Sequence, residues 1–439
     1  MRHIIGFLVL HFTVLGAAGG EPPAPGPIPA ALFTVSEQAL GPLAGEVLNL
    51  DASPDGRHWA CSVQRRGDKR SWVIDGKPGP EFDGGLTGMT FSYDGSRSAY
   101  VAVVGKIRPD MKAFAVVDGR PRPEDDIYQI DLMPDGNRFH FIGRKDGGKT
   151  AIFFDDQPGP TFDGDIHEVV FSPDGNHVAY LVFRGSKRLV IVDGKAGPEY
   201  DKAERPAFCA GNRVAYPACS AGKWFIVTDG KPGQELGYDL VGCLVYGPDG
   251  QRSAYIAYKG DRAFVVVDGQ PQSQYMGVGR LSFSPDGKHL AHVALLEGKG
   301  YFIVVDGKPH ASYSQVGDPF FSQDSKHLAY VAWDTTSKDP KGNQWFVVLD
   351  GQPGPRFNYI EWRGRPGRLT FSPDGKHIAY RVAEQDGSSP RVVVDGEPGP
   401  TYERISNDGV PTFYADGSVG YFAVKSKTLY FVRHVPAAR

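Results

Sequence analysis

Close variants of one stretch, FSPDGKHIAYRVAEQDGSSPRVVVDGEPGP at residues 371–400, recur along nearly the whole chain. Alignment on the turn motif near the start of this stretch gives ten units. They begin at Ser53, Ser92, Met133, Ser172, Cys209, Gly247, Ser284, Ser322, Ser372 and Tyr414. Most units are 37 to 42 residues apart, and the step from Ser322 to Ser372 is 50 residues. A period of this length is typical of solenoids and β-propellers.

The first half of a unit predicts two strands joined by a tight turn. In the unit at Ser172, the apolar run EVVF at 168–171 predicts a strand, and Pro173-Asp174-Gly175 predicts the turn that ends it. Pro presets the first turn dihedral, Asp caps the turn locally and Gly accepts a positive φ. A second strand is therefore expected at 177–183.

The second half of the unit predicts a hairpin with a blocked outer edge. A third strand at 188–192 is followed by Asp193-Gly194, the strongest short signal for a two-residue hairpin turn. The fourth strand, at 195–201, contains Pro198, which lacks a donor for ladder hydrogen bonds and must lie at a sheet edge. Each unit is thus predicted to be a four-stranded antiparallel meander that resists edge-to-edge pairing.

Four strands in about 40 residues are the pattern of a propeller blade. The strands are apolar on both faces, so each sheet has to be covered on both sides by its neighbours. A small residue recurs in the second strand, which fits crowded blades. It is found at Ala60, Ala99, Ala179, Ala215, Ala254, Ala291, Ala329 and Ala379. We expect an all-β fold, a single closed β-propeller of about ten blades. Two smaller propellers are the alternative, but the junction between the fifth and sixth units is too short for a linker.

The two ends of the repeat region predict how the ring closes. The last unit ends in LYFVRHVPAAR and has a third strand but no fourth. The segment ALFTVSE at 31–37 reads as a lone strand before the first unit. We expect this strand to complete the last blade, so that residues 31–439 form the propeller.

The N-terminus predicts export. Residues 1–20 combine Arg2 and His3, a short apolar run and a stretch of small residues, which is the layout of a cleaved signal peptide. A membrane anchor is the alternative, but the apolar run is shorter than the roughly 20 residues of a span and contains His11. Residues 21–30 are rich in Pro and predict a stiff linker. The expected location is periplasmic or secreted, with no transmembrane span after cleavage.

The repeated motifs FSPDGKHLAY and FSPDGKHIAY resemble the WD-repeat-like propeller repeat of the TolB family, also found in the propeller of prolyl oligopeptidases. The resemblance covers roughly residues 45–435. It implies the propeller fold, export and a general role in binding partners. Two family features are not expected in this chain, namely the N-terminal α/β domain of TolB and the hydrolase domain of prolyl oligopeptidases.

Composition and motifs argue against several kinds of function. The net charge of -3 on 439 residues does not indicate nucleic-acid binding. No nucleophile elbow, phosphate-binding loop or zinc-binding His-Glu-x-x-His pair occurs. One turn-flanking position holds His in five units, at His58, His177, His289, His327 and His377. Because these residues belong to separate blades, we expect solvated side chains, and we expect neither a metal nor a cofactor.

The four cysteines do not form a disulfide framework. Cys209 and Cys219 are close in sequence, but the predicted strand register places them about 16 Å apart, beyond disulfide reach. Cys219 and Cys243 are the pair that adjacent blades could bring together. We expect Cys219 and Cys243 to be free thiols rather than to form a disulfide. Cys209 is also expected to stay unpaired.

Propeller topology predicts that the loops divide between two faces. The turns after the first and third strands are short throughout and share one face, whereas the other loops vary in length and sequence and share the opposite face. The variable loops are basic in the first four units and aromatic near Tyr359. The candidate ligand-binding residues are Arg65, Arg66, Lys69, Arg184, Lys187, Tyr359, Trp362 and Arg363.

The leading functional hypothesis is an exported, monomeric, non-enzymatic scaffold that binds a protein or an anionic cell-envelope polymer through this variable face. The alternative is a propeller-fold enzyme that acts on a polysaccharide at the mouth of the ring. Convergence of acids, His and Tyr from several blades at that mouth would favour the enzyme.

Overall fold

The computed structural model describes residues 33–436 except 44, 66, 68, 106–111, 123–125, 134–135, 137, 145–148, 155–156, 336–343, 361–368, 385 and 407–410. The expected signal peptide at 1–20 and the linker at 21–30 lie outside the described residues. Among the described residues, no helix has the length and apolar character needed to cross a membrane.

Six blades are plain four-stranded meanders, and their strands run in order from the innermost outward. Blade 1 is β2 (Val47–Ala52), β3 (Trp59–Gln64), β4 (Arg70–Ile74) and β5 (Lys77–Pro78). Blade 2 is β6 (Thr90–Phe91), β7 (Ser98–Val104), β8 (Lys112–Val117) and β9 (Arg120–Pro121). Blade 3 is β10 (Asp126–Leu132), β11 (Phe139–Arg144), β12 (Thr150–Phe154) and β13 (Gln157–Phe162). Blade 4 is β14 (Asp165–Phe171), β15 (Val178–Arg184), β16 (Lys187–Val192) and β17 (Lys195–Tyr200). Blade 6 is β23 (Leu240–Tyr246), β24 (Ser253–Lys259), β25 (Arg262–Val267) and β26 (Gln270–Tyr275). Blade 7 is β27 (Gly277–Phe283), β28 (Leu290–Leu296), β29 (Gly300–Val305) and β30 (Lys308–Tyr313).

In the other four blades the innermost strand is divided into two short pieces. Blade 5 is β18 (Lys202–Ala203) and β19 (Ala207–Cys209), then β20 (Arg213–Ser220), β21 (Lys223–Thr228) and β22 (Lys231–Pro232), with the 3₁₀ turn η2 (Ala210–Asn212) before β20. Blade 8 is β31 (Gln315–Val316) and β32 (Phe320–Phe321), then β33 (Leu328–Asp334), β34 (Gln344–Leu349) and β35 (Gln352–Phe357). Blade 9 is β36 (Tyr359–Ile360) and β37 (Leu369–Phe371), then β38 (Ile378–Ala383), β39 (Arg391–Val394) and β40 (Glu397–Pro398). Blade 10 is β41 (Arg404–Ile405) and β42 (Thr412–Phe413), then β43 (Val419–Lys425), β44 (Thr428–Pro436) and β1 (Phe33–Pro42).

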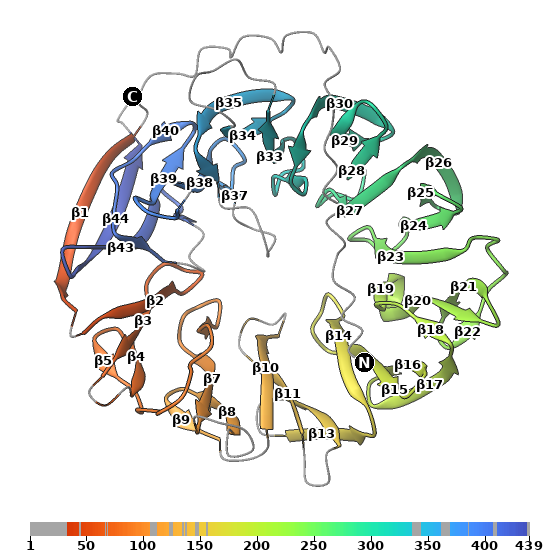
Figure 1. Ribbon diagram of the computed structural model, residues 1–439, viewed down its shortest axis with the longest axis horizontal. Helices are drawn as coiled ribbons and strands as arrows, with labels where there is room; N and C mark the ends of the chain where they lie inside the picture. The colour runs from red at the N-terminus through yellow and green to blue at the C-terminus, as the bar shows by residue number, and fades with distance from the viewer. Residues whose placement is uncertain are drawn as a thin grey trace.

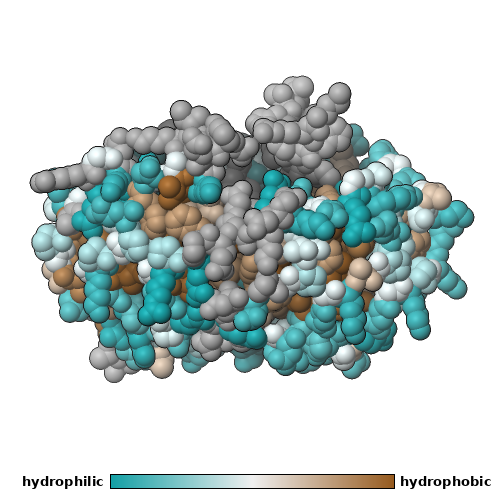
Figure 2. All heavy atoms as spheres, turned by 90° about the horizontal axis from the view of Figure 1, so that it is seen from below, coloured by the Kyte–Doolittle hydropathy of each residue, from teal (hydrophilic) through white to brown (hydrophobic). Residues whose placement is uncertain are grey.

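The ten blades form a single ring, which confirms the predicted fold and decides against two smaller propellers (Figure 1). Seen from the side, the molecule is a flat disc whose surface is mostly hydrophilic (Figure 2). Hydrophobic residues are visible mainly in a band between the two faces, where the sheets pack against one another.

The N-terminal strand closes the ring. β1 pairs antiparallel with β44 from Phe33–Pro436 to Pro42–Thr428, and so becomes the outermost strand of blade 10. The Tyr402 hydroxyl, on the connection from blade 9, donates to Glu37 at 2.5 Å. This is the closure expected from the unpaired strand at the start of the repeats.

The outer strands lie at the sheet edges, as their prolines predict. In β17 the pairing with β16 shifts by one residue between Leu189 and Ile191, so the outer strand bulges at its Gly-Pro step. A Cβ on Gly197 would lie 3.0 Å from the Val190 carbonyl oxygen. The Gly-Pro motif therefore lets the outer strand approach its neighbour closely while leaving its outer edge without a regular row of donors.

The contact between blades uses one position of the second strand. The recurrent alanines are fully buried, and the residue after each alanine, or after its equivalent, is a buried side chain that faces the preceding blade. These residues are Cys61, Tyr100, Phe141, Tyr180, Tyr216, Tyr255, His292, Tyr330, Tyr380 and Tyr421. We call them the interblade residues.

Seven interblade residues contact an aromatic ring that the preceding blade supplies. The ring centroids are 5.6 to 6.5 Å apart. The pairs are Trp72–Tyr100, Phe162–Tyr180, Tyr200–Tyr216, Tyr275–His292, Tyr313–Tyr330, Phe357–Tyr380 and Tyr402–Tyr421. Aromatic pairs in such offset or edge-to-face arrangements add about 0.5–1.5 kcal/mol each beyond the area they bury.

The hairpin turn between the third and fourth strands predicts that Gly194→Val strongly lowers the stability of the fold. Asp193 has φ 47° and Gly194 has φ 76°, as a type I′ turn requires. A Cβ on Gly194 would also lie 3.1 Å from Pro160 of the preceding blade. A β-branched residue at this φ costs about 1–3 kcal/mol, so we expect a clear drop in the thermal midpoint.

The matched control is Lys187→Ala in the same blade, which removes only an exposed ion pair with Asp201. It should leave the midpoint nearly unchanged. Equal shifts for the two variants would contradict the turn assignment.

His140 and His292 predict a loss of stability in acid. Burial lowers the pKa of each imidazole to about 4, from an ordinary value of 6.5. A histidine whose folded pKa is depressed contributes stability above pH 6.5, and that stability falls as the pH falls toward 4. Each residue should cost on the order of 3 kcal/mol by pH 4.

The test is urea unfolding between pH 7 and pH 4.5 of His292→Tyr, which installs the side chain found at most interblade positions. The variant should lose less stability in this interval than the wild type. His177→Asn is the control, because the Asp193 carboxylate raises the pKa of His177 and its loss should not protect against acid. An unchanged acid profile for His292→Tyr would contradict the prediction.

Candidate binding faces

Strand direction sorts the connections onto two faces of the disc. The turns after the first and third strands of each blade lie on one face, which we call the turn face. The loops after the second strand and the crossings to the next blade lie on the other, which we call the variable face.

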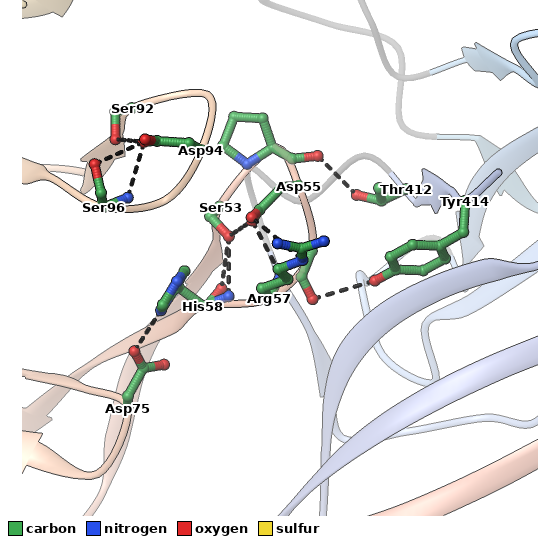
Figure 3. A network of polar contacts seen from close by, with 12 residues as sticks. Ser53, Asp55, Arg57, His58, Asp75, Ser92, Asp94, Ser96, Thr412 and Tyr414 are labelled. Atoms are coloured by element: carbon green, nitrogen blue, oxygen red, sulfur yellow. Dashed lines mark hydrogen bonds and ion pairs between the residues drawn. The ribbon is translucent and has the colours of Figure 1, made fainter. Parts of the chain in front are cut away.

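The Ser-x-Asp-Gly turns of the turn face are closed by their own side chains. In blade 1 the Ser53 hydroxyl donates to Asp55 at 2.5 Å and accepts the His58 backbone N–H at 3.0 Å (Figure 3). The same pair of contacts occurs in blade 2, where the Ser92 hydroxyl donates to Asp94 and accepts the Arg97 backbone N–H. Hydrogen bonds from the Ser96 backbone N–H and the Ser92 hydroxyl lower the pKa of Asp94 to about 2. The turn aspartates are thus structural caps, as the sequence predicted.

Among the described residues, a second aspartate joins the two turns in eight of the blades. In blade 7 the Asp306 carboxylate accepts the Leu290 backbone N–H at 2.9 Å and contacts His289 Nδ1 at 2.6 Å. We call this arrangement the aspartate clamp. Equivalent His–Asp pairs are His58–Asp75, His177–Asp193, His327–Asp350 and His377–Asp395. Arginine replaces histidine in Arg97–Asp118, Arg213–Asp229 and Arg252–Asp268.

The clamp refines the interpretation of the five histidines. They are partly exposed, as expected for solvated residues, but each is oriented through Nδ1 by its aspartate. The partner was not predicted from the sequence, although the Asp-Gly dipeptide at a similar distance after each histidine was the available signal. Within the described part of the chain, no three His, Cys, Asp or Glu side chains gather so as to hold a metal ion.

Neighbouring turns also contact one another around the turn face. The Ala210 N–H donates to the Gly250 carbonyl at 3.0 Å, and the Asp286 N–H donates to Ser325 Oγ at 2.9 Å. At the closure between blades 10 and 1, Tyr414 Oη donates to the Gly56 carbonyl at 3.2 Å (Figure 3). The turn face is therefore a chain of linked turns, and its short loops leave little freedom for a ligand-specific shape.

On the variable face, the basic residues of blade 4 are paired with acids. Arg184 contacts Glu199 at 2.8 Å, and Lys187 contacts Asp201 at 2.7 Å. The Asp201 hydrogen bond raises the pKa of Lys187. Both side chains lie where the sequence placed them, but each already has an acidic partner.

Blade 1 contributes Arg65 and Lys69. The Arg65 guanidinium Nε donates to Ser71 at 3.1 Å, and Lys69 is exposed. Arg66 lies outside the described residues. The structure thus brings Arg65 and Lys69 to one loop, three blades away from Arg184 and Lys187 on the ring.

The innermost strand is irregular in every blade. In blades 1, 3, 4, 6 and 7 its pairing shifts register at a bulge. In blade 2 it is two residues long, and in the remaining blades it is divided. The bulge residues Glu168 and Cys243 have φ 51° and 54°. These interruptions were not predicted from the sequence.

The irregular segments of blades 4 and 5 carry paired charges. Glu168 contacts Arg205 at 3.6 Å, and Glu204 contacts Arg188 at 3.6 Å. Burial raises the pKa of Glu204, and Arg188 opposes that rise. These acids are therefore held in ion pairs between neighbouring blades.

All four cysteines are free, in agreement with the expectation for the thiols.

Aromatic side chains gather where blades 8 and 9 meet on the variable face. Trp333 and Trp345 are stacked with centroids 5.8 Å apart, and Tyr359 meets Trp345 edge-on at 6.4 Å. Trp362 and Arg363, which the sequence placed beside Tyr359, lie outside the described residues. Trp333 was not foreseen, because its neighbour in space, Trp345, follows a long insertion in sequence.

No protein-family model matches the chain. No curated protein matches it significantly. Solved structures that match include a eukaryotic initiation factor (TM-score 0.44, 14% identity, 72% of this chain and 88% of that chain). A hydrazine synthase of Kuenenia stuttgartiensis matches with TM-score 0.33 and 12% identity over 63% of this chain and 98% of that chain. The Dos1 propeller matches with TM-score 0.38 and 9% identity over 70% of this chain and 93% of that chain. The TolB-type resemblance stays a prediction.

The aspartate clamp predicts the effect of changes at Asp306. Asp306→Ala leaves the buried Leu290 N–H without its acceptor and should destabilise the protein by on the order of 1 kcal/mol. Asp306→Asn keeps an acceptor oxygen and should cost less. The measurement is thermal unfolding, with Asp261→Ala in an exposed loop as the control. If the control lowered the midpoint as much as Asp306→Ala, the clamp would have no special role.

Proposed function

We propose that this chain is an exported, non-enzymatic propeller scaffold that binds a protein or a cell-envelope polymer through its variable face. The main support is the contrast between the two faces. The turn face repeats the same caps and clamps from blade to blade, so its residues are accounted for by folding. The variable face carries groups that differ between blades, which is where a regular scaffold places its specificity.

The ion pairs at the inner edge favour binding over catalysis. An enzyme acting at the mouth of the ring would need acids and bases free to exchange protons with a substrate. Glu168 and Glu204 are instead each held by an arginine, and the histidines of the aspartate clamps belong to separate blades on the turn face. A binding role accounts for this arrangement more simply.

The partner class follows from the variable face and the N-terminal sequence. A signal peptide would deliver the chain to the cell envelope or beyond it, where proteins and charged polymers are available. Arg65 and Lys69 offer positive charge to an anionic partner, while Arg184 and Lys187 would have to exchange Glu199 and Asp201 for it. The outer rim is blocked by prolines, which is consistent with a monomer.

The test compares two sets of four substitutions that change the net charge equally. The variable-face set is Arg65, Lys69, Arg184 and Lys187 to Ala. The turn-face set is Arg57, Lys288, Lys326 and Lys376 to Ala, all of them exposed residues on turns. Each protein is immobilised and tested for retention of purified lipopolysaccharide, of peptidoglycan and of proteins from an envelope extract, at several salt concentrations.

We expect the variable-face set to retain less material and to show a weaker dependence on salt, because fewer counterions are exchanged on binding. The turn-face set should behave like the wild type. If only the turn-face set lost binding, recognition would lie on the turn face, and the proposal would be overturned.

A further inference from the structure

Blade 8 carries a row of side chains that the other blades lack. At the variable-face end of the sheet, Gln315 pairs with Trp333, Trp333 with Trp345, and Trp345 with Phe357. Directly paired residues of antiparallel strands project from the same face of a sheet. The four side chains therefore lie side by side on the face of blade 8 that packs toward blade 9.

The tryptophan pair departs from the repeat. At the equivalent cross-strand position, blade 4 has Phe183 and Arg188, blade 6 has Tyr258 and Ala263, and blade 7 has Leu295 and Tyr301. Blade 5 has Cys219 and Trp224. Among the cross-strand pairs described at this position, two aromatic rings face each other in blade 8 alone. The other blades fold without such a pair, so the ring geometry does not require it.

The rings are stacked rather than arranged as a cage. The two indoles are nearly parallel, with 25° between their planes and 5.8 Å between their centroids, so no group fits between them. Tyr359 adds a ring at 79° to Trp345 from the neighbouring blade. All three side chains are partly exposed, unlike the buried interblade residues.

Polar groups flank this aromatic surface on both sides. Next to Gln315, the Ser314 hydroxyl lies 2.8 Å from the Thr335 hydroxyl. Next to Tyr359, the Asn358 side-chain amide donates to Glu384 at 2.5 Å. The second carboxylate oxygen of Glu384 and the carbonyl oxygen of the Asn358 amide can each still accept hydrogen bonds.

We propose that Trp333, Trp345 and Tyr359, with Asn358 and Glu384, form a binding subsite for neutral sugar rings. This inference rests on the proposed function and names the ligand class. The C–H face of a sugar ring packs on an aromatic face, whose π-system is electron-rich, while its hydroxyl groups donate to amide and carboxylate oxygens. The Glu384 carboxylate places negative charge beside the rings, which disfavours an anionic group at this position.

The geometry also separates this ligand from a quaternary ammonium group. Recognition of such a cation uses aromatic faces arranged around it as a cage. Trp333 and Trp345 are stacked against each other and leave no room for a cation between them. A sugar ring, by contrast, needs only one aromatic face and polar groups beside it.

The experiment uses the full chain on a glycan array that carries neutral, N-acetylated and acidic saccharides, followed by calorimetry with the neutral hexasaccharides that give signal. We expect binding to neutral or N-acetylated saccharides, with tryptophan fluorescence changing on titration. Trp333→Ala should weaken the affinity at least tenfold, and Trp333→Phe should restore part of it. Glu384→Gln should weaken it less, because the amide still offers an oxygen.

The control is Trp59→Phe, a conservative change of a tryptophan on the turn face, which should leave sugar affinity unchanged. Absence of binding to every saccharide on the array would overturn the subsite, and so would equal affinity in a folded Trp333→Ala variant. Choline binding that depends on Trp333 would overturn it in favour of a cation site. If retention on the variable face persisted while sugar binding failed, the subsite would be wrong and the proposed function would stand.

Discussion

The architecture depends on the aromatic contact between successive blades. Each sheet has two apolar faces and cannot bury both alone, so a blade is stable only when a neighbour covers it on each side. A tyrosine or histidine in the second strand, packed against a ring from the preceding blade, fixes how adjacent sheets meet. Because the contact recurs at seven interfaces, its geometry sets the angle between blades and closes the chain into a ring.

The same repetition divides the molecule into structural and variable surfaces. Caps and clamps occupy the polar side chains of the turn face, where Asp306 and its equivalents hold the start of the second strand. Residues that do not repeat are then the ones whose presence folding does not explain. Trp333 and Trp345 are such residues, since no other blade described at that position needs two rings to fold. Departure from the repeat is therefore the basis for the proposed subsite.

The fold supplies counterions for basic residues that sequence spacing does not reveal. Arg184 and Lys187 stand out as basic in a short loop, yet Glu199 on the adjacent outer strand and Asp201 just after that strand lie beside them. Exposed pairs of this kind contribute little stability, but they reduce the charge available to a partner. The predicted basic surface is thus more nearly neutral in blade 4 than its loop sequence indicated.

The sequence by itself determined the blade count, the strand order, the turn chemistry and the closing strand, because each follows from a local period, from Pro and Gly at fixed offsets, or from a missing strand at one end. The tertiary structure decided what lies across a blade or between blades. The aspartate clamps, the interrupted inner strands and the pairing of Trp333 with Trp345 and Tyr359 join residues from different strands. Side-chain contacts of this kind depend on register and on the angle between sheets, which no local pattern encodes.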